Sequence, residues 1–392
     1  MTRRPPIYLD NAASTPCDPS VVEAMTPFFA TNFGNPACRH GWGTLAAEAV
    51  ESARRHAANL IGAAPGEIIW TAGATESNNL AIKGVARAAP RDRRHVVTSA
   101  IEHKAVRQPC RRLQAEGFEV TFVEPGPHGI VSAEQVAAAL RHDTPVTVLV
   151  SIIAVNNEIG TVSEVREIGA LCRDRGVLFH TDATQMVGLL PVDVRRDHID
   201  LLSFSGHKIS GPKGVGALYV RDRDPPIAIQ PVIEGGAHER GLRAGTLNVP
   251  GIVGLGRACE LCAATLVDEG PRLLALRRRL EDGLRHRLGE LAINGDPADR
   301  APHITNLCLP SLEGTAVVEH LSEVACSSGS AIGAAGRTTS HVLAAIGVPD
   351  ELAMTSLRLS LGRTTTAEQI DLAIDHIVET IETLRRTANP VT

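Results

Sequence analysis

Lysine is scarce in this 392-residue sequence, although basic residues as a class are not. Of the 39 basic residues four are lysine (Lys83, Lys104, Lys208 and Lys213), and the rest are arginine. Any chemistry that needs a lysine amine therefore has four candidates. The net charge of −5 leaves no excess of positive charge, so we expect no direct contact with nucleic acid.

Long apolar runs and metal-type cysteine patterns are also missing. No stretch of 18 apolar residues occurs, so no membrane span is expected. The arginines at the N-terminus precede no apolar run, so we expect no signal peptide. The cysteines and histidines form no cluster with zinc-finger spacing, which argues against a metal site. We therefore expect a cytoplasmic protein whose thiols stay reduced.

Strand-like and helix-like patterns alternate through the first two thirds of the chain. A helical pattern over 163–176 ends in glycine and separates two apolar runs. Such alternation predicts an α/β fold with a mostly parallel sheet covered by helices on both faces. The strand-like runs are 95–103, 119–125, 145–160, 176–183 and 199–208.

The last third has a different pattern. A loop-rich stretch, 222–251, is followed by a long helical pattern to about residue 290 and then by short strands and helices. The chain length favours two domains. We place a large domain at residues 16–255 and a smaller α+β domain at residues 1–15 and 256–392.

Polar residues end several of the apolar runs. In parallel sheets, ligands bind beyond the carboxyl ends of the strands, so we expect these residues to converge on one rim. Lys208 follows a strand and is flanked by glycines, a sheltered position that suits an amine forming an imine with an aldehyde cofactor. The rim residues are His103, Asn157, Asp182 and His207.

Other residues supply the parts that pyridoxal 5′-phosphate (PLP) needs. Asp182 suits a pyridinium nitrogen and Gln185 a phenolic oxygen. Ala74 and Thr75 open a helix, where backbone N–H groups suit a phosphate. His103 could stack on the cofactor ring and take a catalytic part by shuttling protons. Each has a simpler interpretation as a turn, cap or rim residue. The combination, in this order, predicts a PLP site.

With these residues in place, the sequence resembles the NifS/IscS-like cysteine desulfurases, in the class V aminotransferase branch of the fold-type I PLP enzymes. The resemblance runs nearly end to end. The motifs that carry it are YLDNAAST (8–15), NFGNP (32–36), GATESNN (73–79), EHKAV (102–106), NNEIGT (156–161), HTDATQ (180–185), SGHKISGPKGVGALYV (205–220), ERGLRAGTLNV (239–249), SSGSA (327–331) and LRLSLGRTTT (357–366).

The resemblance implies a role for each matching residue. Lys208 would bind the cofactor covalently and act as the catalytic base. Arg358 would hold the substrate carboxylate as a bidentate partner, and Asn157 would lie near both cofactor and substrate. The remaining cofactor contacts would come from Ala74, Thr75, His103, Asp182, Gln185, Ser205, His207 and, from the partner subunit of a homodimer, Thr246.

One position departs from the family pattern. The resemblance places a nucleophilic cysteine directly after SGSA, where this sequence has Ile332, and residues 333–358 contain no cysteine. Cys326, six residues upstream, could replace it if its pKa were depressed; a small buried hydrophobe is the alternative. The enzyme could also need no protein thiol and cleave the C–S bond of cysteine or cystine by β-elimination.

The function that follows from the resemblance is desulfuration of L-cysteine or a close relative. Alanine and an enzyme persulfide would form, and a sulfur-acceptor protein could take the sulfur to iron–sulfur cluster assembly, thio-modified nucleic acid or a specialised metabolite. A non-catalytic scaffold is the alternative from another class. A scaffold would not need Lys208, Asp182, His103 and Arg358, so their presence argues against it.

Overall fold

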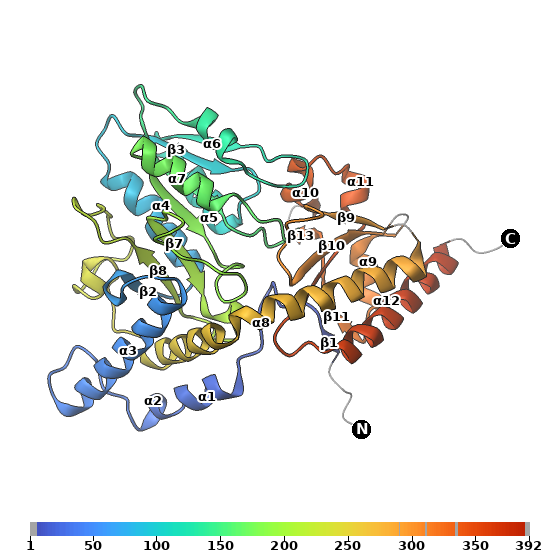
Figure 1. The fold of residues 1–392 in the computed structure, drawn as a ribbon, viewed down its shortest axis with the longest axis horizontal. Helices are drawn as coiled ribbons and strands as arrows, with labels where there is room; N and C mark the ends of the chain where they lie inside the picture. The colour runs from blue at the N-terminus through green and yellow to red at the C-terminus, as the bar shows by residue number, and fades with distance from the viewer. Residues whose placement is uncertain (1–5, 290, 310–311, 334–335, 389–392) are drawn as a thin grey trace.

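A seven-stranded sheet and a smaller four-stranded sheet lie next to each other, and a long helix runs from one to the other (Figure 1). The computed structural model describes residues 6–289, 291–309, 312–333 and 336–388. The α/β architecture, with a large sheet and a smaller α+β part, agrees with the fold expected from the sequence.

The large sheet has the strand order β2-β8-β7-β6-β5-β3-β4. Strands β7, β6, β5, β3 and β4 run parallel, whereas β8 pairs antiparallel with both β2 and β7. The sheet is therefore mixed but mostly parallel, as predicted. The strands are β2 Ile68–Thr71, β3 His95–Ser99, β4 Glu119–Val123, β5 Thr147–Ile153, β6 Leu178–Asp182, β7 Leu201–Ser205 and β8 Gly216–Val220.

Helices cover both faces of this sheet because its strands are apolar on both sides. Along β2, Ile68 and Trp70 belong to one hydrophobic core and Ile69 to another, as the two-residue period of a strand requires. The first core holds α3, α7 and α8, and the second holds α4 and α5. These helices are α3 Gly41–Leu60, α4 Ala74–Ala88, α5 Lys104–Ala115, α7 Val165–Arg175 and α8 Val249–Leu288; α6 Ala133–Ala139 packs on α7 and β4.

The smaller sheet has the order β12-β15-β10-β9, with all pairs antiparallel. A two-stranded pair, β1 with β11, lies beside it, and a third hydrophobic core joins these strands to α8, α9 and α12. The elements are β1 Ile7–Tyr8, β9 Ala292–Asn294, β10 Ile304–Cys308, α9 Gly314–His320, β11 Val324–Ala325, β12 Ser327–Ser328, α10 His341–Ala345, α11 Asp350–Ala353, β15 Ser356–Ser360 and α12 Ala367–Ala388.

Helix α8 passes from one core to the other (Figure 1). Its side chains up to Cys262 pack in the core of the large sheet, and those from Leu273 onward pack in the core of the small one. The helix crosses residue 255 without a break, so the predicted domain limits stay a prediction. Helices α1 Pro19–Met25 and α2 Pro27–Ala30 also pack on it.

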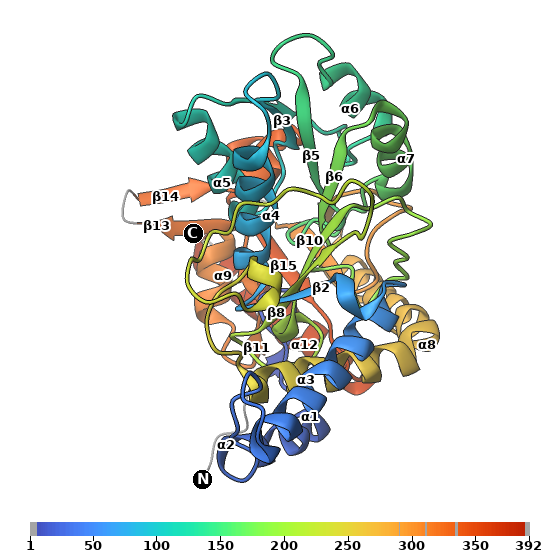
Figure 2. The ribbon, with the colours of Figure 1, turned by 90° about the vertical axis from the view of Figure 1, so that its left-hand side faces the viewer.

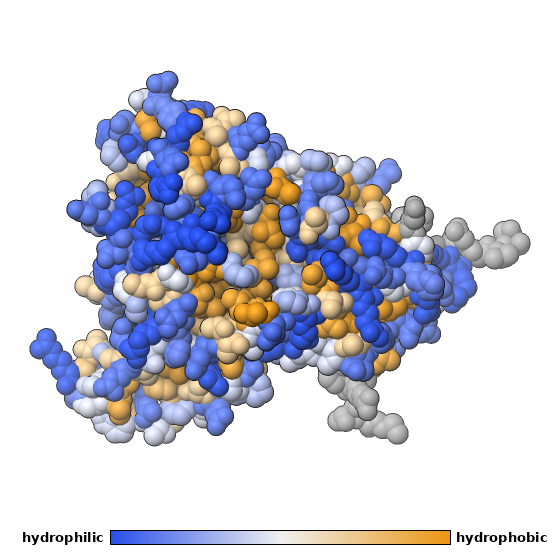
Figure 3. Space-filling view, viewed as in Figure 1, coloured by the Kyte–Doolittle hydropathy of each residue, from blue (hydrophilic) through white to orange (hydrophobic). Residues whose placement is uncertain are grey.

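By length and composition alone, helix α8 could cross a membrane. The sequence did not predict this, because it has no uninterrupted run of 18 apolar residues. Half of its most apolar window is buried inside the protein, where α1, α3 and α12 contact it, so it is a core helix. Figure 3 shows apolar side chains gathered where α8 passes between the two sheets, in an otherwise largely polar face.

Helix α8 also carries a Cys-x-x-Cys pair, Cys259 and Cys262, which the spacing argument overlooked. Both thiols are buried, and burial raises the pKa of each; that of Cys262 is about 11. A thiol that keeps its proton is a poor metal ligand. Within the described ranges no three His, Cys, Asp or Glu side chains are grouped as a metal site would need.

Candidate active site

A cavity of about 970 Å³ opens at the carboxyl ends of β5, β6 and β7, opposite the start of α4. The predicted convergence of the strand-end residues on one rim is therefore present in the structure. Ten of the twelve residues proposed from the sequence line this cavity: Ala74, Thr75, His103, Asn157, Asp182, Gln185, Ser205, His207, Lys208 and Arg358.

Lys208 lies in a short 3-10 turn, Gly206–Lys208, directly after β7. Its Nζ donates hydrogen bonds to the carbonyl oxygens of Ala12 and Ala13, the latter at 2.7 Å. Burial, and next the positive charge of Arg358, lowers its pKa to about 8, although Asp182 and Asp10 oppose the shift. A larger share of the amine is therefore unprotonated, and nucleophilic, near neutral pH than for an exposed lysine.

This lowered pKa predicts the pH dependence of cofactor capture. Only the unprotonated amine attacks an aldehyde, so the capture rate should rise about tenfold per pH unit below pH 8 and level off above about pH 9. Stopped-flow absorbance of cofactor-free protein mixed with PLP measures this rate. A rate that keeps rising through pH 10 would show a lysine with an ordinary pKa.

Asp182 ends β6 and is held by two hydrogen bonds. Its Oδ2 accepts from Asn78 Nδ2 at 2.7 Å, and its Oδ1 accepts from the backbone N–H of Thr184 at 3.1 Å. Each carboxylate oxygen has a further lone pair, so the group can still accept a proton-bearing nitrogen from a ligand in the cavity. Two lining atoms, Asn78 Oδ1 and Thr184 Oγ1, are buried without a partner, which also fits a polar ligand.

The backbone at the start of α4 packs closely against β8. Gly73 has φ +151°, a conformation that favours glycine, and a Cβ on Gly216 would lie 2.6 Å from the Gly73 Cα. The helix N-terminus that follows presents backbone N–H groups of a kind that binds phosphate. Ser205 lies against Gly73, and burial together with Lys208 and Lys213 lowers the pKa of His207 to about 4, so His207 is neutral.

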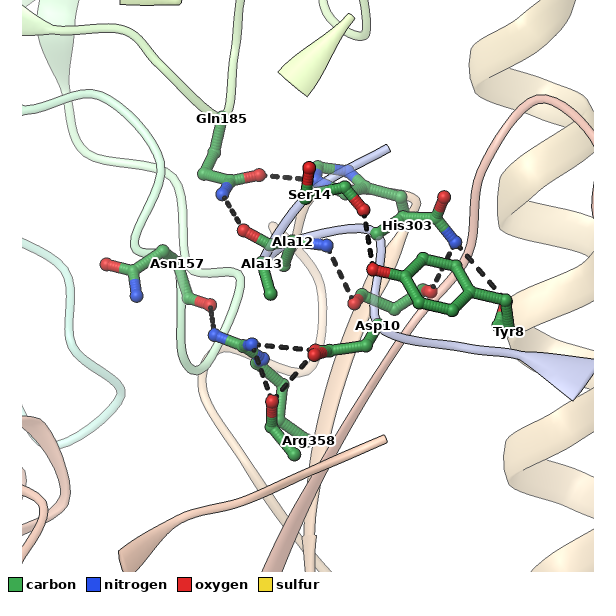
Figure 4. Close-up of polar contacts among 12 residues, drawn as sticks. Tyr8, Asp10, Ala12, Ala13, Ser14, Asn157, Gln185, His303 and Arg358 are labelled. Carbon is green, nitrogen blue, oxygen red and sulfur yellow. Dashed lines mark hydrogen bonds and ion pairs between the residues drawn. The ribbon is translucent and has the colours of Figure 1, made fainter. Parts of the chain in front are cut away.

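The orientations of His103 and Gln185 are fixed by hydrogen bonds. His103 caps α5, and its Nδ1 accepts from the backbone N–H of Ala105 at 3.1 Å. Gln185 donates from Nε2 to Ala12 O at 2.9 Å, and its Oε1 lies 3.2 Å from His303 Nε2 (Figure 4). His303 is fully buried and its pKa is about 3, so the neutral ring donates to the Gln185 oxygen.

Arg358, on β15, reaches the cavity from the small sheet (Figure 4). Its Nη1 donates to Asn157 O at 3.1 Å, and its Nη2 donates to Asp10 Oδ1 at 2.8 Å and to Ser327 Oγ at 2.9 Å. These contacts hold the guanidinium plane between the two sheets. Its Nε is buried without a partner, so the group still has a donor to offer.

Two of the proposed residues do not line the cavity. Cys326 packs against the core of the small sheet, and burial raises its pKa to about 12, the opposite of the depressed pKa that a nucleophile needs. These observations favour the interpretation of Cys326 as a small buried hydrophobe, and its role as the nucleophile stays a prediction. Thr246 is exposed in the loop between β8 and α8, so it can contact another subunit but not the cavity of its own.

Sequence reasoning missed the residues that hold the predicted ones in place. Asp10 and the Ala12 carbonyl lie within YLDNAAST, and Asn78 lies within GATESNN, so the motifs already marked these segments. For His303 no sequence signal was present. Its partner Gln185 is 118 positions away, and only the fold brings the two together.

Residues 7–372 match the family model described as "Aminotransferase class-V". The chain belongs to the class-V aminotransferase family. The sequence is 50% identical over 383 residues to proteins named "Cysteine desulfurase IscS" from Klebsiella pneumoniae and Salmonella schwarzengrund, with 97% of this chain and 94% of each relative covered. The chain is thus a class-V aminotransferase of the cysteine desulfurase group, as the motifs predicted.

Solved structures give the same assignment. A "NifS-like protein" superposes with a TM-score of 0.89 at 36% identity, covering 96% of this chain and all of that one. "SspA in complex with cysteine" gives 0.80 at 40% identity, with coverage of 90% and 98%. DndA from Streptomyces lividans gives 0.77 at 41% identity, with coverage of 90% and 99%. The fold is that of the fold-type I PLP enzymes.

Proposed function

We propose that this class-V aminotransferase binds PLP through Lys208 and removes sulfur from L-cysteine, leaving alanine. One observation carries the proposal: a lysine amine with a lowered pKa, a held carboxylate and an arginine meet in one cavity. These are the groups that capture an aldehyde, pair with a pyridinium nitrogen and bind an amino-acid carboxylate. The similarity to cysteine desulfurases supports the substrate.

The lining residues fit the cofactor part by part. Ala74 and Thr75 at the start of α4, with Ser205 and His207, would hold the phosphate. Asp182 would pair with the ring nitrogen and His103 would lie against the ring. Gln185 and Asn157 would contact the phenolic oxygen. Thr246 would come from the partner subunit of a homodimer, in agreement with its exposure.

The chain's own groups supply binding and proton transfer. When bound, PLP supplies an electron sink for negative charge at the substrate Cα. Arg358 would orient the substrate by its carboxylate, and Lys208 Nζ would take the Cα proton and later return a proton to carbon. The pKa of about 8 suits an amine that must both accept and release a proton near neutral pH.

The fate of the sulfur depends on a position where we expect this chain to differ from its family. That Ile332 occupies the position of the family's nucleophilic cysteine stays a prediction. None of the eight cysteines lines the cavity, and Cys326 is a poor candidate for the persulfide. The same observation favours a second candidate function, β-elimination of L-cysteine or L-cystine to pyruvate, which needs no protein thiol.

Product analysis with a cysteine variant tests this proposal. Holoenzyme is incubated with L-cysteine and, separately, with L-cystine, and alanine and pyruvate are measured. We expect alanine from L-cysteine, and Cys326→Ala should retain at least about half of the rate because that thiol keeps its proton. Alanine lost in the variant would restore Cys326 as the nucleophile. Pyruvate as the main product would establish elimination, and neither product would refute both functions.

The remaining proposals concern the setting of the reaction. We infer a cytoplasmic homodimer that hands its sulfur to an acceptor outside the chain, which could be a protein of iron–sulfur cluster assembly. The net charge of −5 supports no direct nucleic-acid contact.

A further inference from the structure

A second cavity of about 360 Å³ adjoins the active-site cavity. Asn157 and Arg358 line both, so the two spaces share a wall. The side cavity lies between α5 and the base of the hairpin formed by β13 Ser330–Gly333 and β14 Gly336–Thr339, which projects from the edge of the molecule (Figure 2). That hairpin carries Ile332, so the side cavity adjoins the segment where the missing thiol is expected.

Three cations from one face of α5 line the side cavity. Lys104, Arg107 and Arg111 are spaced three and four residues apart, which places them along one side of the helix. None of them makes an ion pair with any residue that the structure describes. Burial, and next the charge of Arg111, lowers the pKa of Arg107, although Glu102, Glu124 and Glu158 oppose the shift.

One carboxylate, Glu158, lines the side cavity beside these three cations. It accepts a hydrogen bond from the hydroxyl of Ser340, and burial raises its pKa, although Ser340, Arg358 and Lys104 oppose the shift. A further acid, Asp10, is already paired with Arg358.

Unsatisfied donors on the lining residues also require an acceptor. Arg107 Nε and Asn306 Nδ2 are both buried without a hydrogen-bond partner, and both residues line the side cavity. Asn306 is only 1% exposed. Buried donors without acceptors are unfavourable, and anionic oxygens satisfy them best. The site is therefore built for an anion, and its volume suits a small molecule.

We propose that the side cavity binds a small thiol carrying a carboxylate, and that this thiol is the sulfur acceptor of the reaction. The proposal rests on the proposed desulfuration and names its co-substrate. Lys104, Arg107 and Arg111 hold the carboxylate, and the shared wall at Asn157 and Arg358 brings the thiol beside the substrate.

The transfer balances without a protein cysteine. The acceptor's thiolate attacks the substrate sulfur, an S–S bond forms and the Cβ–S bond breaks. The bonding electron pair stays on Cβ, which takes up a proton to become the methyl group of alanine. L-cysteine and the thiol thus give alanine and a persulfide of the thiol. The sulfur is oxidised, Cβ is reduced, and no further oxidant is needed.

Two thiols that differ in one group test the charge requirement. 3-Mercaptopropionate and 3-mercaptopropan-1-ol have the same chain length, but only the first has a carboxylate. L-cysteine is itself a small thiol with a carboxylate, so it is held well below its KM to leave the side cavity free. Under these conditions 3-mercaptopropionate should raise alanine formation by the holoenzyme above the rate without added thiol. It should reach half-saturation at about a tenfold lower concentration than the alcohol, and its persulfide should form in equal amount to alanine.

Two neighbouring arginines on α5 supply a matched control. The double variant Arg107→Gln/Arg111→Gln should raise the half-saturating concentration of 3-mercaptopropionate about tenfold, without changing that of the alcohol or the KM for L-cysteine. Arg112→Gln should change none of them, because Arg112 is paired with Glu116 and does not line the side cavity.

The outcomes separate this inference from the proposed function. If alanine forms equally well with both thiols, the anion site is overturned and the desulfuration stands. The same holds if the double variant loses alanine formation equally with both thiols. Pyruvate in place of alanine, or no product with either thiol, overturns the desulfuration itself. Unchanged melting temperatures of the cofactor-loaded variants exclude misfolding as the cause of lost alanine formation.

Discussion

Lys208→Ala is expected to lose covalent cofactor capture and at least about 10⁴-fold in alanine formation, because one substitution removes both the amine that binds the aldehyde and the base that moves the Cα proton. The absorption band of the covalently bound cofactor should disappear, and the rate of alanine formation from L-cysteine should fall to background. Lys208 Nζ is the amine that the Ala12 and Ala13 carbonyls hold in the cavity.

Lys213 provides the matched control for this experiment. It also lines the cavity, five residues further along, but it is exposed. Lys213→Ala should therefore keep the absorption band and change the rate by less than about threefold. If Lys213→Ala loses the band while Lys208→Ala keeps it, the assignment of the two lysines is reversed.

Asp182→Asn should lower alanine formation by at least about a hundredfold while the protein still captures the cofactor. The asparagine cannot keep a ring nitrogen protonated by charge, so the electron sink is weakened, whereas Lys208 is untouched. The local fold should survive. Asn78 Oδ1 is unpartnered, so turning the Asn78 amide over offers the substituted side chain an acceptor in place of a donor.

The measurement separates chemistry from binding. Cofactor absorbance and the PLP dissociation constant are determined beside the rate of alanine formation. We expect the absorption band to persist and the rate to fall. A variant within about threefold of the wild-type rate would show that Asp182 is only a structural residue at the end of β6.

The sequence predicted the elements that depend on local pattern. Alternating apolar runs gave the parallel strands of the large sheet, and the helix over 163–176 ends as expected at Gly176, which has φ +64°. The position of Lys208 after a strand was also readable, because the strand and its glycine-rich turn are contiguous in the chain.

Contacts between distant segments were not predictable in this way. Lys208 and the Ala12 carbonyl are 196 positions apart, and Arg358 and Asp10 are 348 apart. The surroundings of Cys326 were not readable from the sequence for the same reason. Six residues of sequence separate it from Ile332, but the surrounding strands β11 and β12 pack it against the core of the small sheet, where the thiol keeps its proton.

The central claim concerns one nitrogen atom, and its most direct test is to locate the cofactor on the chain. Holoenzyme is reduced with borohydride, digested and mapped by mass spectrometry. We expect a single pyridoxyl group on the peptide that contains Lys208. A group on any other lysine, or none on protein saturated with PLP, would contradict the account.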